Sequence, residues 1–337
     1  MTLETIKSIT LGASGVTEEA DGFHFYRFTQ AEEAFYKERN ADFYRKTFST
    51  SGIKLEFETD ASELYFNADM APSSSRTYFA FDLYIDGKYS DSLKNYTEED
   101  EKTLKYHEKA YKLGAFEKTF ALGKGKKTVK LVFPWSVTPS VKAIELKDST
   151  FVSPVKKFKK LLVYGDSITH GYDALHPSLS YAELMTAAFN AECVNKAIGG
   201  EIFCAELSSF KADFTPDFIT VAYGTNDWNN VATAKEFERN CRGFIENLIK
   251  NYPGVKIFAF TPIWRDVSGK DDKFCKFEEL DGFMHKIYSD YDAIQCISCR
   301  HFVPESSDYF ADLTLHPNEK GFAPYASGVI AAIKENI

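Results

Sequence analysis

Apolar and polar residues follow two different periods along the chain. Up to about residue 150, short segments alternate between apolar and polar positions, which is typical of strands with one buried face. Turn residues such as Asp86-Gly87 separate these segments. Many short strands joined by turns predict a β-sandwich or jelly roll. The strand-like runs are 22–28, 53–59, 63–68, 77–85, 118–122, 127–133 and 141–146.

The period changes after Lys157. Strand-length apolar runs now alternate with segments of helical period, and the stripe over 234–252 is the clearest of these. This alternation predicts βαβ units and a three-layer α/β domain with a mostly parallel sheet. We therefore expect two domains, 1–152 and 153–337. The predicted strands of the second domain are 161–164, 192–197, 218–223, 256–260 and 293–297, and its further helices are 181–189, 274–288 and 322–337.

The composition narrows the class of partner. The 337 residues carry a formal net charge of -9, which opposes binding to a phosphate backbone or to an anionic membrane surface. The N-terminus shows no leader pattern, no apolar run approaches spanning length, and all six cysteines lie in the second half. We expect a cytoplasmic protein with reduced cysteines and with neither nucleic acid nor membrane as a partner. The oligomeric state leaves no mark in the sequence.

Four short polar blocks follow the predicted strands of the second domain. Gly165-Asp-Ser167, Gly199-Gly200 and Asn226 come after the first, second and third strands, and His316 precedes the last helix. Ligands of open α/β sheets bind outside the carboxyl ends of the strands. Each block alone is usually structural, because serines and asparagines cap helices and paired glycines form turns.

Together these blocks supply what acyl transfer needs. Ser167 is a hydroxyl nucleophile, and His316 is a base that can take its proton near neutral pH. Asp312 can hold the imidazole in the right tautomer. The N–H groups of Ser167 and Gly200 and the Asn226 side-chain amide can stabilise an oxyanion.

Other chemistries lack their marks. No dinucleotide or phosphate-loop motif follows a strand, and no Gly-x-Ser-x-Gly elbow occurs. Cys296, Cys299 and His301 offer three zinc ligands without an evident fourth, so two core or loop cysteines are the simpler interpretation. We therefore expect no cofactor and no metal.

The blocks resemble, in order, the four blocks of the SGNH (GDSL-type) hydrolases. The match covers about residues 157–337. The resemblance implies a flavodoxin-like α/β/α sheet and metal-free esterase or acylhydrolase activity. It also implies that Ser167 is the nucleophile, that Gly200 and Asn226 complete the oxyanion hole, and that His316 is the base. Counting from Asn195 favours Gly200 over Gly199.

The last block departs from the family pattern. The family's usual spacing is Asp-x-x-His, but position 313 is Leu and the nearest acid is one residue further back, at Asp312. Residues three and four apart face the same way in a helical turn, so Asp312 remains the expected partner of His316. Asp308 or a backbone carbonyl is the alternative.

The first domain sharpens the expected substrate. A β-sandwich joined to an SGNH domain resembles the two-domain carbohydrate esterases that remove acetyl groups from plant polysaccharides or oligosaccharides. Trp228 and Trp264 follow the third and fourth strands, where each could stack on a sugar ring or simply pack in the core. We expect an esterase acting on an acetylated carbohydrate. The alternatives are a lipid or thioester acylhydrolase and a non-catalytic carbohydrate-binding protein.

Overall fold

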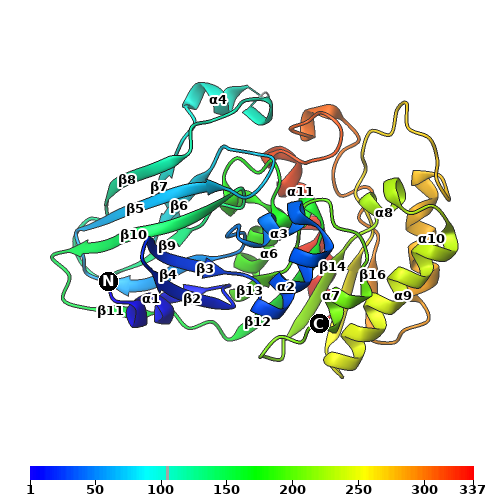
Figure 1. Cartoon of the computed structure of the whole chain (residues 1–337), viewed down its shortest axis with the longest axis horizontal. Helices are drawn as coiled ribbons and strands as arrows, with labels where there is room; N and C mark the ends of the chain where they lie inside the picture. The colour runs from blue at the N-terminus through cyan, green and yellow to red at the C-terminus, as the bar shows by residue number, and fades with distance from the viewer. Residues whose placement is uncertain (104–105) are drawn as a thin grey trace. The chain divides into compact units, whose positions relative to one another are not determined.

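The chain folds into two compact units. The computed structural model describes residues 1–103 and 106–337 (Figure 1). The first unit, called here the sandwich unit, comprises Met1–Phe158, Ala174–Leu179 and Glu192–Val194. The second, the α/β unit, comprises Lys159–Asp173, Ser180–Ala191 and Asn195–Ile337. Two short segments from within the second half of the sequence therefore belong to the first unit.

Two antiparallel sheets form the sandwich unit, as the alternating pattern predicts. The first has the order β1-β4-β9-β6-β7, with β11 paired to β4, and the second has the order β2-β3-β10-β5-β8. The strands of the first sheet are β1 (Thr10–Leu11), β4 (Lys54–Thr59), β9 (Lys127–Val132), β6 (Ala80–Ile85), β7 (Lys88–Lys94) and β11 (Val152–Pro154). Those of the second are β2 (Gly15–Glu19), β3 (Gly22–Tyr26), β10 (Val137–Lys147), β5 (Glu63–Pro72) and β8 (Gly114–Ala121).

An aromatic core fills this unit. Alternate residues of β5 are buried, and Phe66 from this strand packs on Phe81 of β6 with ring centroids 4.8 Å apart. Phe133 contacts Phe81 and also Phe25 of β3, so rings from both sheets meet in one cluster. Aromatic pairs in such edge-to-face arrangements contribute beyond the area that they bury. The many phenylalanines of the first half therefore serve the core.

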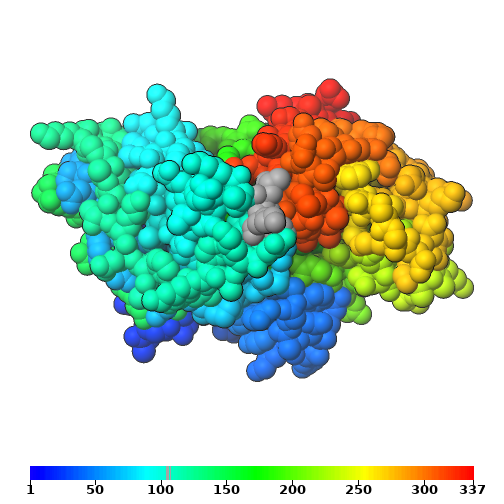
Figure 2. All heavy atoms as spheres, turned by 90° about the horizontal axis from the view of Figure 1, so that it is seen from above, coloured from blue at the N-terminus to red at the C-terminus, as the bar shows by residue number. Residues whose placement is uncertain are grey.

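Helices decorate the sandwich unit at positions that the alternating pattern does not reveal. They are α1 (Leu3–Ile9), α2 (Gln30–Arg39), α3 (Ala41–Thr47), α4 (Glu98–Lys102) and the short 3₁₀ turn Tyr106–Glu108. A capping box between Thr29 and Glu32 starts α2, and Asn40 caps α3. Figure 2 shows α2 and α3 (blue) at the surface of this unit.

The second half of the chain forms a five-stranded parallel sheet in the order β13-β12-β14-β15-β16. Numbered in chain order within this sheet, the strands run 2-1-3-4-5, so the flavodoxin-like expectation is confirmed. The strands are β13 (Ala191–Asn195), β12 (Lys159–Gly165), β14 (Phe218–Ala222), β15 (Lys256–Phe260) and β16 (Ile294–Ile297).

Helices pack on both faces of this sheet. Tyr164 of β12 contacts Phe244 of α9, whereas Phe218 of β14 contacts Phe189 at the end of α6. Phe218 pairs with Leu161, which lies on the opposite face of β12 from Tyr164. The longer helices are α6 (Tyr181–Ala188), α9 (Ala234–Asn251), α10 (Leu280–Tyr288) and α11 (Glu319–Lys334). The shorter ones are α5 (Ser167–His170), α7 (Ala205–Ser209), α8 (Thr225–Asn230) and the 3₁₀ turns Phe277–Glu279 and Ser307–Tyr309.

The segment Ala174–Leu179, called here the inserted segment, is held firmly within the sandwich unit. The Trp135 indole N–H donates to the Ala174 carbonyl at 2.8 Å, and the Tyr96 hydroxyl donates to the Leu175 carbonyl at 3.0 Å. Asp82, which is fully buried, accepts from the backbone N–H and the hydroxyl of Ser178. The His176 Nδ1 atom lies 2.7 Å from the same carboxylate.

Candidate active site

The turn after β12 presents Ser167. Asp166 follows the strand and caps α5, where its carboxylate accepts the Ile168 N–H at 3.0 Å. A Cβ atom at Gly165 would lie 2.2 Å from the Thr169 hydroxyl oxygen, so the tight turn requires glycine. Ser167 is the first residue of α5 and is 4% exposed.

The position of this turn follows from the strand order. Gly165 of β12 pairs with Ala222 of β14, so the segments that follow these two strands leave the sheet side by side. One segment carries Ser167 and the other carries Asn226. In a sheet of order 2-1-3-4-5 this is the topological switch point, where open α/β folds bind their ligands.

A closed loop before α11 carries His316. Phe310 and Pro317 form an isolated β-bridge, and the Ala311 N–H donates to the His316 carbonyl at 2.8 Å. The His316 Nε2 atom lies 2.9 Å from the Ser167 hydroxyl oxygen. The ring is thus within hydrogen-bond reach of the Ser167 hydroxyl proton, a geometry that general-base catalysis would require.

Asp312 occupies the other side of the His316 ring. One carboxylate oxygen lies 2.8 Å from Nδ1, and the other accepts the backbone N–H groups of Thr314, Leu315 and His316 at 3.0, 2.7 and 3.0 Å. Leu313 absorbs the additional residue of the Asp-x-x-x-His spacing by adopting a left-handed backbone with φ 62°. Of the three acceptors considered from the sequence, the structure places the Asp312 carboxylate at Nδ1.

The exposed Asp308 serves the fold elsewhere. Its backbone carbonyl accepts the Asn318 side-chain amide at 2.8 Å, next to the start of α11.

Asp312 stays ionised in this setting. Burial opposes its ionisation, but the hydrogen bond and charge of His316, together with the Leu315 and Thr314 N–H groups, outweigh burial. They hold the pKa of Asp312 well below its usual range. A carboxylate that remains charged accepts the Nδ1 proton and leaves Nε2 free to act as the base.

The turn at Gly199-Gly200 distinguishes its two glycines. The Gly199 N–H donates to Nδ1 of the buried His170 at 3.2 Å. The Gly200 N–H makes no hydrogen bond within the described part of the chain, and the residue adopts φ 92°, which favours glycine. The Gly200 N–H is therefore the one available to a substrate.

Asn226 is bound to the same turn. Its side-chain amide donates to the carbonyl of Glu201 at 3.1 Å, which leaves its second amide hydrogen for another acceptor. The backbone N–H of Ser167 likewise has no acceptor among the residues 1–103 and 106–337. The three expected donors thus all retain a hydrogen that a developing oxyanion could accept.

Buried carboxyls brace this arrangement. Asp227 accepts the N–H groups of Phe203 and Gly224, each at 3.0 Å, and joins the start of α8 to the segment after Gly200. Burial, opposed by these two bonds, raises the pKa of Asp227 to about 7. Burial likewise raises the pKa of Asp166 to about 6, against the Ile168 N–H and the charge of His316.

The structure separates the two candidate tryptophans. Trp228 is 1% exposed, packs on Phe277, and donates its indole N–H to the Cys275 carbonyl. A side chain buried in this way offers little surface to a sugar, so the structure favours the alternative of core packing for Trp228. Trp264 is partly exposed and contacts Phe310, which opens the His316 loop. Trp264 therefore remains a candidate for stacking on a sugar ring.

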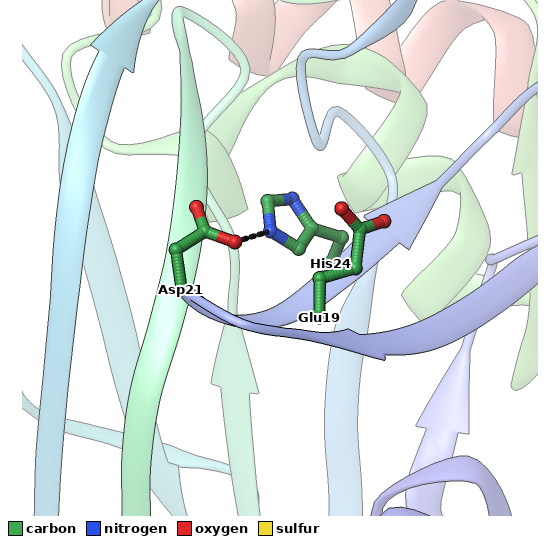
Figure 3. Close-up of side chains that lie close together, drawn as sticks. All are labelled: Glu19, Asp21 and His24. Carbon is green, nitrogen blue, oxygen red and sulfur yellow. Dashed lines mark hydrogen bonds and ion pairs between the residues drawn. The ribbon is translucent and has the colours of Figure 1, made fainter.

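Two sets of side chains bring metal-type ligand atoms within 4.8 Å of one another in the described ranges. In Figure 3, the His24 ring of the first set bonds to Asp21 on one side while Glu19 lies on the other. Glu19 itself accepts the Tyr26 hydroxyl, so hydrogen bonds along the β2–β3 hairpin account for this group. The second set is Asp173, Asp312 and His316, in which Nδ1 is already engaged by Asp312. Cys296, Cys299 and His301 do not form a third such set among these residues.

Asp173 is a further residue near His316 that no sequence pattern predicts. It is fully buried, and its carboxylate lies 3.5 Å from the His316 Nδ1 atom. It stands in Gly171-Tyr172-Asp173, just after α5, and no periodicity or family block marks it. Only the three-dimensional path of this loop brings it to the site.

Residues 163–323 match the model of the GDSL-like lipase/acylhydrolase family. The α/β unit belongs to this family. The chain is accordingly a carboxylic ester hydrolase with a GDSL-type unit and an added β-sandwich. None of the curated proteins compared with the chain matches it.

Solved structures extend the likeness to both units. A salicylyl-acyltransferase from a tetracycline biosynthetic pathway has a TM-score of 0.75 at 16% identity, covering 96% of this chain and 94% of its own. A family two carbohydrate esterase from Cellvibrio japonicus has 0.66 at 16%, covering 98% and 96%. An acetyl xylan esterase from the rumen bacterium Butyrivibrio proteoclasticus has 0.63 at 15%, covering 99% and 97%. At these identities the likeness establishes the fold.

The helices of the GDSL-type unit and of the sandwich are short or polar. None that the structure describes combines the length and the apolar character needed to cross a bilayer.

Proposed function

We propose that the protein is a serine esterase that removes acetyl and other short acyl groups from the hydroxyls of an oligo- or polysaccharide. The observation that carries this proposal is the continuous relay from Ser167 through His316 to Asp312. Its two links measure 2.9 and 2.8 Å. Such a relay activates a hydroxyl that is otherwise a weak nucleophile.

The first half of the reaction forms an acyl-enzyme. The Ser167 oxygen attacks the ester carbonyl carbon while its proton passes to Nε2 of His316. The carbonyl oxygen becomes an oxyanion, which accepts hydrogen bonds from the Ser167 and Gly200 N–H groups and from the Asn226 amide. The intermediate then collapses, the carbon–oxygen bond to the sugar breaks, and the Nε2 proton goes to the departing hydroxyl.

The second half releases the acid. Water, deprotonated by Nε2, attacks the acyl carbon of the Ser167 ester. The second oxyanion uses the same donors, and the Ser167 oxygen leaves with the proton returned by His316. Throughout, Asp312 remains charged and keeps the ring oriented.

Two features support a carbohydrate ester as the substrate. Carbohydrate esterases are among the solved structures that share both units, and one of them is named as an acetyl xylan esterase. Trp264, partly exposed beside the His316 loop, provides an aromatic face of the kind that stacks on sugar rings. The low exposure of Ser167 fits a small acyl group.

The decisive experiment compares hydrolysis of 4-nitrophenyl acetate by the wild type, Ser167→Ala and Ser289→Ala. We expect the first variant to lose about 10⁴- to 10⁶-fold in kcat. The second, an exposed serine at the end of α10, should leave the rate unchanged. Hydrolysis that persists in Ser167→Ala would refute the proposal, and an inactive wild type would favour a non-catalytic carbohydrate-binding protein.

Substrate class requires a second comparison. Acetylated xylo- and manno-oligosaccharides should be deacetylated with higher kcat/KM than 4-nitrophenyl acetate, and 4-nitrophenyl esters should be hydrolysed more slowly as the acyl chain lengthens. Faster hydrolysis of long-chain esters or of acyl thioesters would instead indicate a lipid or thioester acylhydrolase.

A further inference from the structure

The Nδ1 side of His316 faces two carboxylates. The nearer is Asp312 at 2.8 Å, and the other is Asp173 at 3.5 Å. A neutral imidazole carries a single ring N–H. When this hydrogen is on Nδ1, the geometry directs its hydrogen bond to Asp312. A second carboxylate at this distance nevertheless acts on the ring through its charge.

Asp173 is held in place on both sides along the chain. Its own backbone is left-handed, with φ 65°, a conformation that aspartate tolerates better than most residues. The following residue, Ala174, begins the inserted segment and is fixed by the Trp135 indole N–H. The preceding residue, Tyr172, stacks on the His316 ring with centroids 5.5 Å apart. The carboxylate is therefore positioned rather than free to turn away.

We propose that Asp173 is a second carboxylate partner of His316, a positioning residue that stabilises the imidazolium formed during acyl transfer and substitutes in part for Asp312. This inference rests on the proposed esterase function. The ring gains a positive charge each time Nε2 takes a proton, and both carboxylates then face that charge across Nδ1.

Other charged groups around the ring do not take this role. The Asp166 carboxyl interacts with His316 through its charge but is engaged as the cap of α5. Arg265 acts on Asp166 and Asp312, and Lys270 acts on Asp312. Both are cations and disfavour an imidazolium. Among the groups facing the ring, Asp173 is the one carboxylate besides Asp312 that approaches Nδ1 in the described part of the chain.

Asparagine variants test the inference while keeping the loops intact. Asp312→Asn retains an oxygen for the three backbone N–H groups but places an amide at Nδ1, which favours the wrong ring tautomer. If Asp173 substitutes in part, Asp312→Asn should lose only about 10²-fold in kcat, short of the roughly 10⁴-fold expected where one aspartate acts alone. Adding Asp173→Asn to the Asp312→Asn variant should lower kcat further, so that the double variant approaches the loss of roughly 10⁴-fold. Equal effects of Asp173→Asn in both backgrounds would overturn the inference.

The pH profile separates a charge effect from a loss of packing. Asp173→Asn alone should lower kcat several-fold with KM unchanged. It should also move the acidic limb of kcat/KM to lower pH by about 0.7 unit, because a unit charge some 4 Å away acts on the ring even through a water-like dielectric. The exposed Asp308→Asn is the matched control and should leave the limb in place. An unmoved limb in folded Asp173→Asn would contradict the proposal.

Histidine-selective NMR on the full-length protein gives a reading that does not depend on turnover. The His316 resonance, assigned with His316→Asn, should titrate at lower pH in Asp173→Asn than in the wild type. If that variant does not fold, Asp312→Asn decides alone. The His316 ring should keep a substantial Nδ1–H population there, and a complete switch to the Nε2–H tautomer would overturn the inference. If the wild type is active but the His316 titration is the same in Asp173→Asn, this inference alone is refuted. If the wild type shows no Ser167-dependent hydrolysis, the proposed function is refuted.

Discussion

The two units bury charged groups for different ends. In the sandwich unit, the fully buried Arg27 donates to the Ser49 carbonyl and hydroxyl, and Asp82 binds the inserted segment. Each ties separate segments of chain together. In the α/β unit, burial raises the pKa of Asp166 to about 6 and of Asp227 to about 7 at the carboxyl ends of β12 and β14. Here buried carboxyls affect the charge and the shape of the candidate site. Burying a charged group costs free energy in both units, but in the sandwich unit the buried groups hold segments of chain together, whereas in the α/β unit they lie where the chemistry is proposed.

The largest expected contrast comes from Asn226→Ala. Removing one oxyanion donor costs about 10²- to 10³-fold in kcat, because the donor contributes most when the oxyanion forms. KM for 4-nitrophenyl acetate should change little. Asn230→Ala is the matched control, since this amide donates to the Asn226 carbonyl within α8. A kcat within threefold of the wild type for Asn226→Ala would remove Asn226 from the oxyanion hole.

Asp227 should make stability depend on pH. Its folded pKa of about 7 exceeds the ordinary value of an unfolded aspartate, so the native state holds a proton that the unfolded chain has released. Asp227 makes its full contribution to the free energy of unfolding below about pH 4. This contribution is lost as the pH rises towards about 7, by up to about 4 kcal/mol. Urea unfolding across this range should show the decline in the wild type.

The control for that decline is Asp227→Asn. The amide cannot accept both backbone N–H groups, so the variant should be less stable at every pH by about 1–3 kcal/mol. Its disadvantage should shrink as the pH rises, because only the wild type loses the protonated carboxyl. A difference that stays constant from pH 4 to 8 would show that Asp227 is ionised throughout.

Trp135→Phe should affect assembly more than chemistry. Phenylalanine keeps most of the ring but leaves the buried Ala174 carbonyl without its donor, at a cost of about 1–3 kcal/mol in unfolding free energy. We expect a lower midpoint of thermal unfolding and only a few-fold lower kcat. Trp264→Phe, which removes an indole that makes no hydrogen bond in the described ranges, should leave the midpoint unchanged. A lower unfolding midpoint for Trp264→Phe than for Trp135→Phe would contradict the expected difference between the two units.

The smallest expected effect belongs to Trp264→Ala. If this ring stacks on a sugar, KM for acetylated xylo-oligosaccharides should rise a few-fold, in keeping with about 1 kcal/mol for an exposed aromatic contact. KM for 4-nitrophenyl acetate should not change, because that substrate has no sugar. Equal changes for both substrates would indicate that Trp264 supports the His316 loop through Phe310 and does not bind carbohydrate.

The sequence reveals the parts of this protein that follow a period. The strands of both units and the order of the polar blocks are predicted because a buried strand needs an apolar run and a turn needs its breaker residue. Four strands of the sandwich unit are not predicted. Strands β2 and β7 are largely polar or exposed, and β1 and β11 are only two and three residues long. The surface helices α2 and α3 are not predicted because each carries its aromatics as one adjacent pair, Phe35-Tyr36 and Phe43-Tyr44, and not as a stripe at helical spacing.

The site shows the same limit. Ser167 and Asn226 could be named as candidates because each follows a strand, and His316 because it precedes the last helix. The choice between Gly199 and Gly200 depends on which N–H His170 occupies. Trp228 follows a strand as Trp264 does, and only packing around Phe277 shows that it is buried. Asp173 reaches the site by a loop path that no local pattern encodes.

The inserted segment also bears on how this protein can be divided or recombined. A fragment beginning near residue 153 would carry Ala174–Leu179 without Trp135, Tyr96 and Asp82, the residues that satisfy its polar groups. The loop that bears Asp173 would then lose its anchor. A gene fusion that replaced residues 1–152 would therefore have to preserve the three groups that bind the inserted segment.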